Sequence, residues 1–218
     1  MTNDILIRED ANGVATLTMN TPKTLNALSE DMISALQTQF DDLMEDKSTR
    51  VVILRGSGKA FCAGMDLSAE GNVFGLDESR TPTLKEMQAY EEMDGVRDSA
   101  GKVTLAIYDC KKPVIGAING AAVGVGATMA CAMDIRLASE KARFGFVFGK
   151  IGIVAEGCST WFLPRIVGMQ QSLKWMLLLP YLQVSCQHRL NKTALHPHVI
   201  NQHSVRHCLG RANQSNSP

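Results

Sequence analysis

Residues 59–67 read Lys-Ala-Phe-Cys-Ala-Gly-Met-Asp-Leu, and residues 118–127 read Ile-Asn-Gly-Ala-Ala-Val-Gly-Val-Gly-Ala. Each segment follows a short apolar run that predicts a buried strand, at residues 50–55 and 113–118 respectively. Glycine lets backbone N–H groups turn outward and lets a ligand approach closely. A helix that begins after such a loop adds the positive end of its dipole. Two such loops that face each other can offer two N–H donors to one oxygen, as an oxyanion hole requires.

Two other interpretations of these segments are open at this point. Both segments can be tight turns with no ligand. Gly124 and Gly126 also form the beginning of a dinucleotide-binding pattern. That pattern needs a third glycine at position 129, where this chain has Met129, so nucleotide binding is disfavoured.

Strands and helices are expected to alternate along the chain, which predicts an α/β architecture. Residues 5–19 predict a hairpin with its turn at Asn12-Gly13, and residues 29–46 predict an amphipathic helix with Ser29 as its N-cap. Further elements are expected at residues 84–109 (a helix interrupted near Gly101), 124–132 (helix), 134–138 (strand), 157–167 (helix) and 169–179 (helix).

Composition indicates one globular domain of ordinary type. Of the 218 residues, 45% are apolar and 20% are charged, and the 22 basic residues balance the 22 acidic ones. This balance gives no overall field that would attract nucleic acid or a membrane surface, so we expect neither partner. The polar N-terminus does not resemble a signal peptide, and the six cysteines show no CxxC spacing. We therefore expect reduced cysteines and a cytoplasmic protein.

The chain changes character near residue 178, which divides it into a core domain, residues 1–178, and an atypical tail, residues 179–218. All five histidines lie in the last 31 residues, and no Asp or Glu follows Glu156. The tail is expected to be weakly ordered or to come from an altered reading frame. His203 and His207 have the spacing of metal ligands on a helix, but no carboxylate or thiolate is suitably spaced, so no metal site is predicted.

Four ordered motifs resemble the crotonase (enoyl-CoA hydratase/isomerase) family. They are residues 21–28 (Thr-Pro-Lys-Thr-Leu-Asn-Ala-Leu), 60–67, 113–120 and 134–139, the last followed by Phe144-Gly145. The resemblance covers about residues 5–178. It implies an α/β, crotonase-like spiral of repeated ββα units with peripheral helices, assembled as a homotrimer or hexamer. It also implies an acyl-CoA thioester substrate, a place in fatty acid metabolism, and no separate cofactor, because coenzyme A is part of the substrate.

The resemblance also assigns residues to roles. The backbone N–H groups that would stabilise a thioester enolate belong to Met65 and Val125. The expected substrate-binding positions are Lys23, Leu25, Ala27, Ala63, Asp66 and Leu67. For Lys23 a solvated surface lysine is an equal alternative, and for Asp66 a loop-capping role is favoured over chemistry.

The catalytic base is where this sequence departs from the hydratases of the family. Those enzymes use two glutamates, and the matching positions here are Thr128 and Phe148, neither of which can act as a carboxylate base. Glu156 lies before a predicted helix, where some isomerases of the family carry a functional acid. Its alternative role is that of a helix N-terminal acid. Apolar surroundings are expected to raise the pKa of Glu156 and favour the catalytic role.

Three functions remain open from the sequence. The first is an enoyl-CoA double-bond isomerase in which Glu156 is the single carboxylate base, since one acid can remove a proton from one carbon and return it to another. The second is an enoyl-CoA hydratase or another enolate-based acyl-CoA lyase. The third is a non-catalytic acyl-CoA binder or a damaged pseudo-enzyme, which the unusual tail favours.

Overall fold

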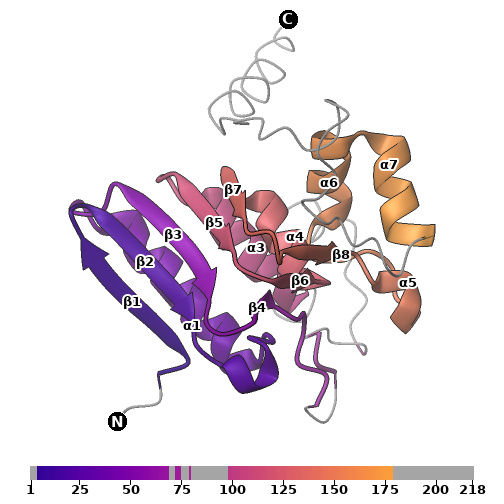
Figure 1. Cartoon of the computed structure of the whole chain (residues 1–218), viewed down its shortest axis with the longest axis horizontal. Coiled ribbons are helices and arrows are strands. Elements are labelled where there is room, and N and C mark those ends of the chain that lie inside the picture. The colour runs from indigo at the N-terminus through magenta and orange to yellow at the C-terminus, as the bar shows by residue number, and fades with distance from the viewer. Residues whose placement is uncertain (1–3, 69–71, 75–78, 80–97, 179–218) are drawn as a thin grey trace, which may run out of the picture.

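The computed structural model describes residues 4–68, 72–74, 79 and 98–178. The predicted tail, with His203 and His207, and the predicted helix between residues 84 and 97 lie outside these residues. Two β-sheets and a set of flanking helices make up the described part (Figure 1). In chain order the elements are β1 (Leu6–Ala11), β2 (Val14–Met19), η1 (Pro22–Thr24), α1 (Glu30–Glu45), β3 (Val51–Gly56), β4 (Ala60–Cys62), α3 (Ser99–Asp109), β5 (Val114–Ile118), β6 (Ala121–Val123), α4 (Val125–Ala132), β7 (Ile135–Ala138), β8 (Arg143–Gly145), α5 (Phe148–Ile151), α6 (Ser159–Val167), α7 (Met169–Leu173) and η2 (Lys174–Leu178).

Successive strand pairs divide between the two sheets. The larger sheet has the order β1-β2-β3-β5-β7, and the smaller one has the order β4-β6-β8. Strands β1 and β2 are antiparallel, and every other pairing in the two sheets is parallel. The pairs β3–β4, β5–β6 and β7–β8 each place one strand in each sheet, and a helix follows before the next pair. This arrangement is the spiral of stacked ββα units that the sequence predicts.

The N-terminal hairpin forms as predicted. Ala11 pairs with Val14 across a two-residue turn, and Asn12 and Gly13 both have positive φ values, 54° and 79°. Two consecutive positive φ values match the right-handed twist of the strands, and Asn-Gly tolerates them well. The hairpin therefore fixes the register of β2, which then pairs in parallel with β3.

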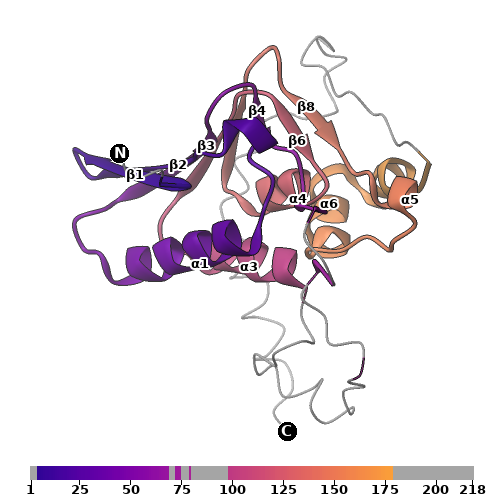
Figure 2. The ribbon, with the colours of Figure 1, turned by 90° about the horizontal axis from the view of Figure 1, so that it is seen from below.

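Helices α1 and α3 lie side by side beneath the larger sheet (Figure 2). The predicted N-cap of α1 is confirmed, because Met32 N donates to Ser29 Oγ at 3.2 Å. The buried side chains of α1 recur at helical spacing and face the sheet; they are Met32, Ile33, Leu36, Phe40 and Leu43. The core thus lies between the sheet and this helical layer.

One helix prediction needs correction. Helix α3 runs without interruption through Gly101, whose N–H donates to the N-capping Asp98 Oδ1 at 2.6 Å. The glycine marks the first turn of the helix rather than a break in its middle. The helix expected over residues 169–179 is confirmed for its described residues, as α7 followed by one π-helical turn, η2.

The smaller sheet was not predicted as a separate element. Strands β4, β6 and β8 are three residues long, and Ala60, Ala121 and Ala122 carry too little side chain to show an alternating pattern. The two glycine-containing segments follow β3 and β5 as predicted, and each one contains a short strand, β4 or β6, before its glycine loop. The two segments lie side by side, since β4 pairs with β6.

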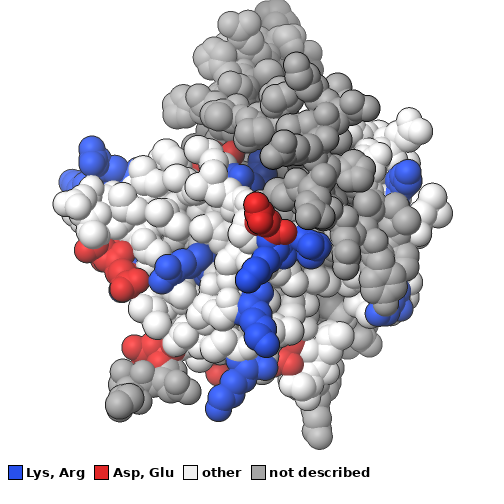
Figure 3. Space-filling model, viewed as in Figure 1, with Lys and Arg blue, Asp and Glu red and all other residues white. Residues whose placement is uncertain are grey.

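Charged side chains are dispersed over the face shown in Figure 3, where Lys and Arg form a narrow column near the centre and no broad patch. The described residues contain no helix that is both long and apolar enough to cross a membrane.

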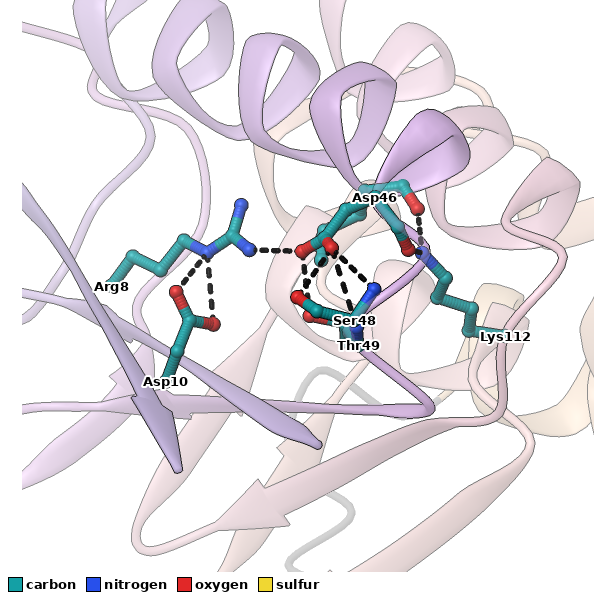
Figure 4. Close-up of polar contacts among 7 residues, drawn as sticks. Arg8, Asp10, Asp46, Ser48, Thr49 and Lys112 are labelled. Carbon is teal, nitrogen blue, oxygen red and sulfur yellow. Dashed lines mark hydrogen bonds and ion pairs between the residues drawn. The ribbon is translucent and has the colours of Figure 1, made fainter. Parts of the chain in front are cut away.

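Asp46, at the C-terminal end of α1, joins the hairpin to the helical layer (Figure 4). Its carboxylate accepts from Ser48 Oγ at 2.6 Å and from Thr49 Oγ1 at 2.7 Å. Arg8 Nη2 of β1 lies 2.6 Å from Asp46 Oδ2. The hydrogen bonds from the two hydroxyls hold the pKa of Asp46 well below its usual range, and Arg8 contributes less.

Lys112 completes this junction from the loop before β5. Its Nζ donates to the backbone oxygens of Leu43 and Asp46, which belong to the open end of α1 (Figure 4). A cation at these carbonyls also complements the negative end of the helix dipole.

We predict that Asp46→Asn lowers the midpoint of urea unfolding at neutral pH. Because the pKa of Asp46 is lowered in the folded state, its contribution to stability is present above the usual carboxyl pKa and is lost as the pH falls below it. The difference between the variant and the parent chain should therefore shrink below about pH 4. Asp41→Asn, an exposed change on the same helix, is the control; an equal effect at every pH would contradict this role.

Candidate active site

The first glycine-containing segment lies against residues 21–28, the motif that precedes α1. Leu28 N donates to Gly64 O at 2.8 Å, and Asp66 N donates to Leu28 O at 3.0 Å. These two bonds form a parallel bridge between Leu28 and Met65. In such a bridge the N–H of the middle residue faces the opposite side, so Met65 N–H points away from Leu28.

Asn26 fixes the shape of the 21–28 motif. It is fully buried, and its Nδ2 donates to Ser57 O and Ala60 O, both at 2.9 Å, while its Oδ1 accepts from Thr21 N at 3.0 Å. Leu25 and Asn26 both have positive φ values, 56° and 57°. Asparagine tolerates this backbone conformation better than most residues, which explains the Leu-Asn pair of the motif.

The two glycine-containing loops are in contact. A Cβ atom added to Gly64 would lie 3.2 Å from Val123 O, and one added to Gly124 would lie 3.9 Å from Gly64 Cα. The contact is tighter two residues later, where a Cβ on Gly126 would lie only 2.4 Å from Cys62 O. Helix α4 therefore begins directly against the last residue of β4.

Gly124 sets the start of α4. Its φ of 52° and ψ of −122° suit glycine alone, and its carbonyl accepts from Ala127 N and Thr128 N, both at 3.0 Å. Val125 N–H lies in the first turn, where no preceding helical carbonyl can pair with it. Within the described residues, Met65 N–H and Val125 N–H have no acceptor. Each follows one of the two touching glycines, which is the geometry expected of paired donors.

The predicted substrate-binding residues belong to two segments that are in contact beside Met65. Ala63 N donates to Leu25 O at 3.1 Å, so the two halves of the predicted set are adjacent. Leu25 and Leu67 are 43% and 56% exposed, which leaves apolar surface beside the site. Ala27 lies between Leu25 and the bridge residue Leu28, and Lys23 is exposed at the outer end of the motif.

Asp66 has the expected loop-capping role. Its Oδ1 accepts from Ser68 Oγ at 2.6 Å and from Ser68 N at 3.0 Å, and the hydroxyl bond lowers the pKa of Asp66.

Thr128 and Phe148, which stand at the positions of the two hydratase glutamates, both have structural roles in this chain. Thr128 is fully buried on α4, and its Oγ1 donates to Gly124 O at 3.2 Å. Phe148 is 2% exposed and packs in an apolar cluster with Phe146 and Trp175. Neither position offers a proton acceptor to a substrate.

Glu156 lies close to the start of α4 through its neighbour Gly157. A Cβ added to Gly157 would lie 3.3 Å from Thr128 Cγ2 and 3.4 Å from Ala100 Cβ. Thr128 is the residue that bonds to the Gly124 carbonyl. The loop that carries Glu156 thus packs between α4 and the first turn of α3, next to the predicted donor loop.

The Glu156 carboxyl is half-buried and incompletely paired. Its Oε2 is buried and has no hydrogen-bond partner among the described residues. Burial, followed by the charge and hydrogen bond of the neighbouring Asp98, raises the pKa of Glu156 to about 8. The carboxyl of the free protein is therefore mainly protonated at neutral pH. A buried oxygen without a partner is suited to a ligand atom.

Asp98 is the residue that sequence reasoning missed. An aspartate before a helix is an N-cap signal, and it could have placed the start of α3. The signal carries no information about Glu156, which lies far away along the chain and contacts Asp98 only after folding. Among the described residues, two carboxyl groups therefore lie together at this candidate site.

No group of three His, Cys, Asp or Glu side chains in residues 4–68, 72–74, 79 and 98–178 is arranged to hold a metal ion.

Comparison with known proteins agrees with this architecture. The sequence model of the enoyl-CoA hydratase/isomerase family matches residues 9–185. The chain belongs to the enoyl-CoA hydratase/isomerase family. The match begins and ends close to the limits of the resemblance seen in the sequence, and it includes both glycine-containing segments and Glu156.

Relatives within this family have more than one activity in their names. Enoyl-CoA hydratase ACTT3 of Alternaria alternata is 38% identical over 164 residues, which cover 75% of this chain and 50% of the relative. The 1,2-epoxyphenylacetyl-CoA isomerase of Escherichia coli is 34% identical over 166 residues, which cover 76% of this chain and 59% of the relative. The chain therefore spans about half the length of the curated relatives it matches.

Solved structures show the same crotonase-like fold. The enoyl-CoA hydratase of Bacillus anthracis superposes with a TM-score of 0.66 at 29% identity, covering 79% of this chain and 62% of that structure. The enoyl-CoA hydratase of Mycobacterium smegmatis gives a TM-score of 0.64 at 32% identity, with 80% and 63% covered.

We predict a pH-dependent effect of Glu156→Gln on stability. The folded-state pKa of about 8 exceeds the ordinary value of 4.5, so the glutamate's contribution is fully present below 4.5 and is lost as the pH rises through about 8. Urea unfolding should show that the variant gains stability relative to the parent chain at about pH 9 but not at about pH 4. If the stability difference between the variant and the parent chain stays constant across this range, the pKa of Glu156 is not raised. Asp41→Asn serves as the control.

Proposed function

We propose that this chain binds an acyl-CoA thioester and stabilises its enolate. The reaction that we propose first is the shift of a double bond in an enoyl-CoA. The observation that carries the proposal is the contact between the Gly64 and Gly124 loops. It supports convergence of the Met65 and Val125 N–H groups on one thioester oxygen. Membership of the enoyl-CoA hydratase/isomerase family supports the substrate class.

The N–H groups of Met65 and Val125 act on the difficult step of the reaction, which is formation of the enolate. Removal of a proton next to a thioester carbonyl places negative charge mainly on the carbonyl oxygen. Two fixed N–H groups stabilise that charge more than they stabilise the neutral carbonyl, and each is worth about 3 kcal/mol of barrier. The substrate-binding role of Lys23, Leu25, Ala27, Ala63, Asp66 and Leu67 belongs to the same proposal.

Glu156 is the proposed acid and base. Its carboxylate removes a proton from the carbon next to the thioester carbonyl, and the resulting carboxylic acid returns it to a carbon farther along the chain. A pKa of about 8 makes the ionised group a stronger base than an ordinary glutamate. Since the ionised form of the free protein accepts the proton, kcat/KM for isomerisation should rise with pH through about 8.

Hydration is the second candidate, and Asp98 is the observation that favours it. Addition of water needs one group that activates the water and one that supplies a proton. The Asp98–Glu156 pair contains two carboxyl groups in contact, although neither occupies the position of the usual hydratase glutamates.

A homotrimeric or hexameric assembly is also proposed, on the family likeness alone.

We predict that purified protein converts a 3-enoyl-CoA into the conjugated 2-enoyl-CoA, followed by ultraviolet absorbance, and that Glu156→Gln slows this conversion at least about 100-fold. Glutamine preserves the size of the side chain but cannot accept the proton. Coenzyme A binding, measured by calorimetry, should be retained in the variant.

The products distinguish the candidates. Conversion of a supplied 2-enoyl-CoA into a 3-hydroxyacyl-CoA, with no double-bond shift in the 3-enoyl-CoA, would support hydration and overturn isomerisation. Binding of acyl-CoA without turnover in the parent chain would indicate a non-catalytic binder.

A second prediction concerns the oxyanion donors. Gly126→Ala places a methyl group against Cys62 O, so the start of α4 must shift and misalign Val125 N–H. We expect kcat to fall about 100-fold while circular dichroism stays unchanged. Gly149→Ala is the matched control, because its Cβ would lie 3.6 Å from the nearest atom, an ordinary contact. Equal rates for both variants would argue against the donor role of α4.

A further inference from the structure

Asp98 occupies a fixed position between two elements of the site. It precedes α3, and its Oδ1 accepts from Gly101 N at 2.6 Å, which anchors the carboxyl to the first turn of the helix. The same carboxyl lies close enough to the Glu156 carboxyl for a hydrogen bond to form when the two groups share one proton. Ala100, two residues on, lies next to Gly157, since a Cβ added to Gly157 would lie 3.4 Å from Ala100 Cβ, so the residues beside the two acids are also close together.

The pairing leaves Glu156 with one oxygen engaged and one available. Since its Oε2 has no partner in the described part of the chain, the contact with Asp98 sets how the Glu156 carboxyl is oriented. A side chain with several rotatable bonds loses this orientation when its one anchor is removed. An N-cap with a helix behind it is a rigid anchor.

We propose that Asp98 is a positioning residue which holds Glu156 by a carboxyl–carboxyl hydrogen bond and keeps one proton shared between the two groups. The inference rests on the proposed acid–base role of Glu156. It adds a second acidic side chain to the site, at a position that does not match the usual glutamates of the family's hydratases.

The electrostatics agree with a shared proton. Two close carboxyl groups resist simultaneous ionisation, so the pair retains one proton to a higher pH than either group alone. The raised pKa of Glu156 has burial as its first cause and Asp98 as its second. Packed around this pair, α4 contributes Thr128 and α6 contributes Ser159, which are uncharged. Among the described residues, the titratable group that acts on Glu156 is Asp98.

The proton balance of an isomerisation follows directly. The pair first loses its shared proton to solvent, which leaves Glu156 ionised. The C–H bond next to the thioester carbonyl then breaks, and its proton forms an O–H bond on Glu156 Oε2, the oxygen that Asp98 does not engage. In the second half-step this O–H bond breaks and a C–H bond forms on the carbon at the far end of the shifted double bond. No electron is gained or lost overall.

Asp98→Asn and Asp98→Ser test the role without removing the helix cap, because Asn and Ser are both good N-caps. Removal of the negative charge should lower the pH at which kcat/KM rises by about one unit. The high-pH plateau of kcat should also fall several-fold, since Glu156 becomes a weaker base and is less firmly held. The control is Asp41→Asn, an exposed aspartate of α1 outside the site. An unmoved pH profile in both Asp98 variants would overturn the proposal.

A second measurement does not depend on turnover. Infrared difference spectra recorded during a pH titration of the free protein should contain a protonated-carboxyl band that titrates near pH 8 and is absent from Glu156→Gln. In Asp98→Asn the same band should titrate at lower pH. If the band does not move, the pair is refuted even in an active enzyme. If the band moves but the parent chain has no acyl-CoA turnover, the pair stands and the proposed function fails.

Discussion

The close approach of α4 to the C-terminal end of β4 is the constraint on which the rest of this site depends. Gly126 permits it, because any side chain there would overlap Cys62 O, and Gly64 and Gly124 extend the contact to the two loops. Parallel pairing of β4 with β6 brings the segments together, and the residue after each touching glycine keeps an N–H that the described residues do not use. The fold thereby holds the polar groups of the proposed site in place before a ligand arrives.

A second constraint acts on Glu156. Its loop packs between the first turns of α3 and α4, so the carboxyl is removed from most of the solvent and placed beside Asp98. Both effects favour the protonated form in the free protein. The same packing that raises its basicity therefore requires loss of a proton before the group can act as a base. The raised pKa of Glu156 therefore affects both the pH dependence of folding stability and that of the proposed reaction.

The sequence was informative where local patterns determine structure. Asn12-Gly13 predicted the hairpin turn, Ser29 predicted the start of α1, and the family motifs predicted the ββα spiral. It did not predict β4, β6 and β8, whose small residues carry no periodic pattern. At Gly101 it predicts a break, whereas the glycine lies in the first turn of α3. Motif positions directed attention to Met65, Val125 and Glu156. Nothing in local sequence could have paired Asp98 with Glu156, because their contact depends on the packing of α3 against α4.

The most direct test of the central claim is a crystal structure of the protein with acetoacetyl-CoA, whose thioester oxygen readily carries enolate charge. The account predicts that this oxygen lies within about 2.7–3.1 Å of both Met65 N and Val125 N, with the carbon that would lose its proton facing Glu156. A thioester oxygen bound elsewhere, or bound by only one of these nitrogens, would contradict it.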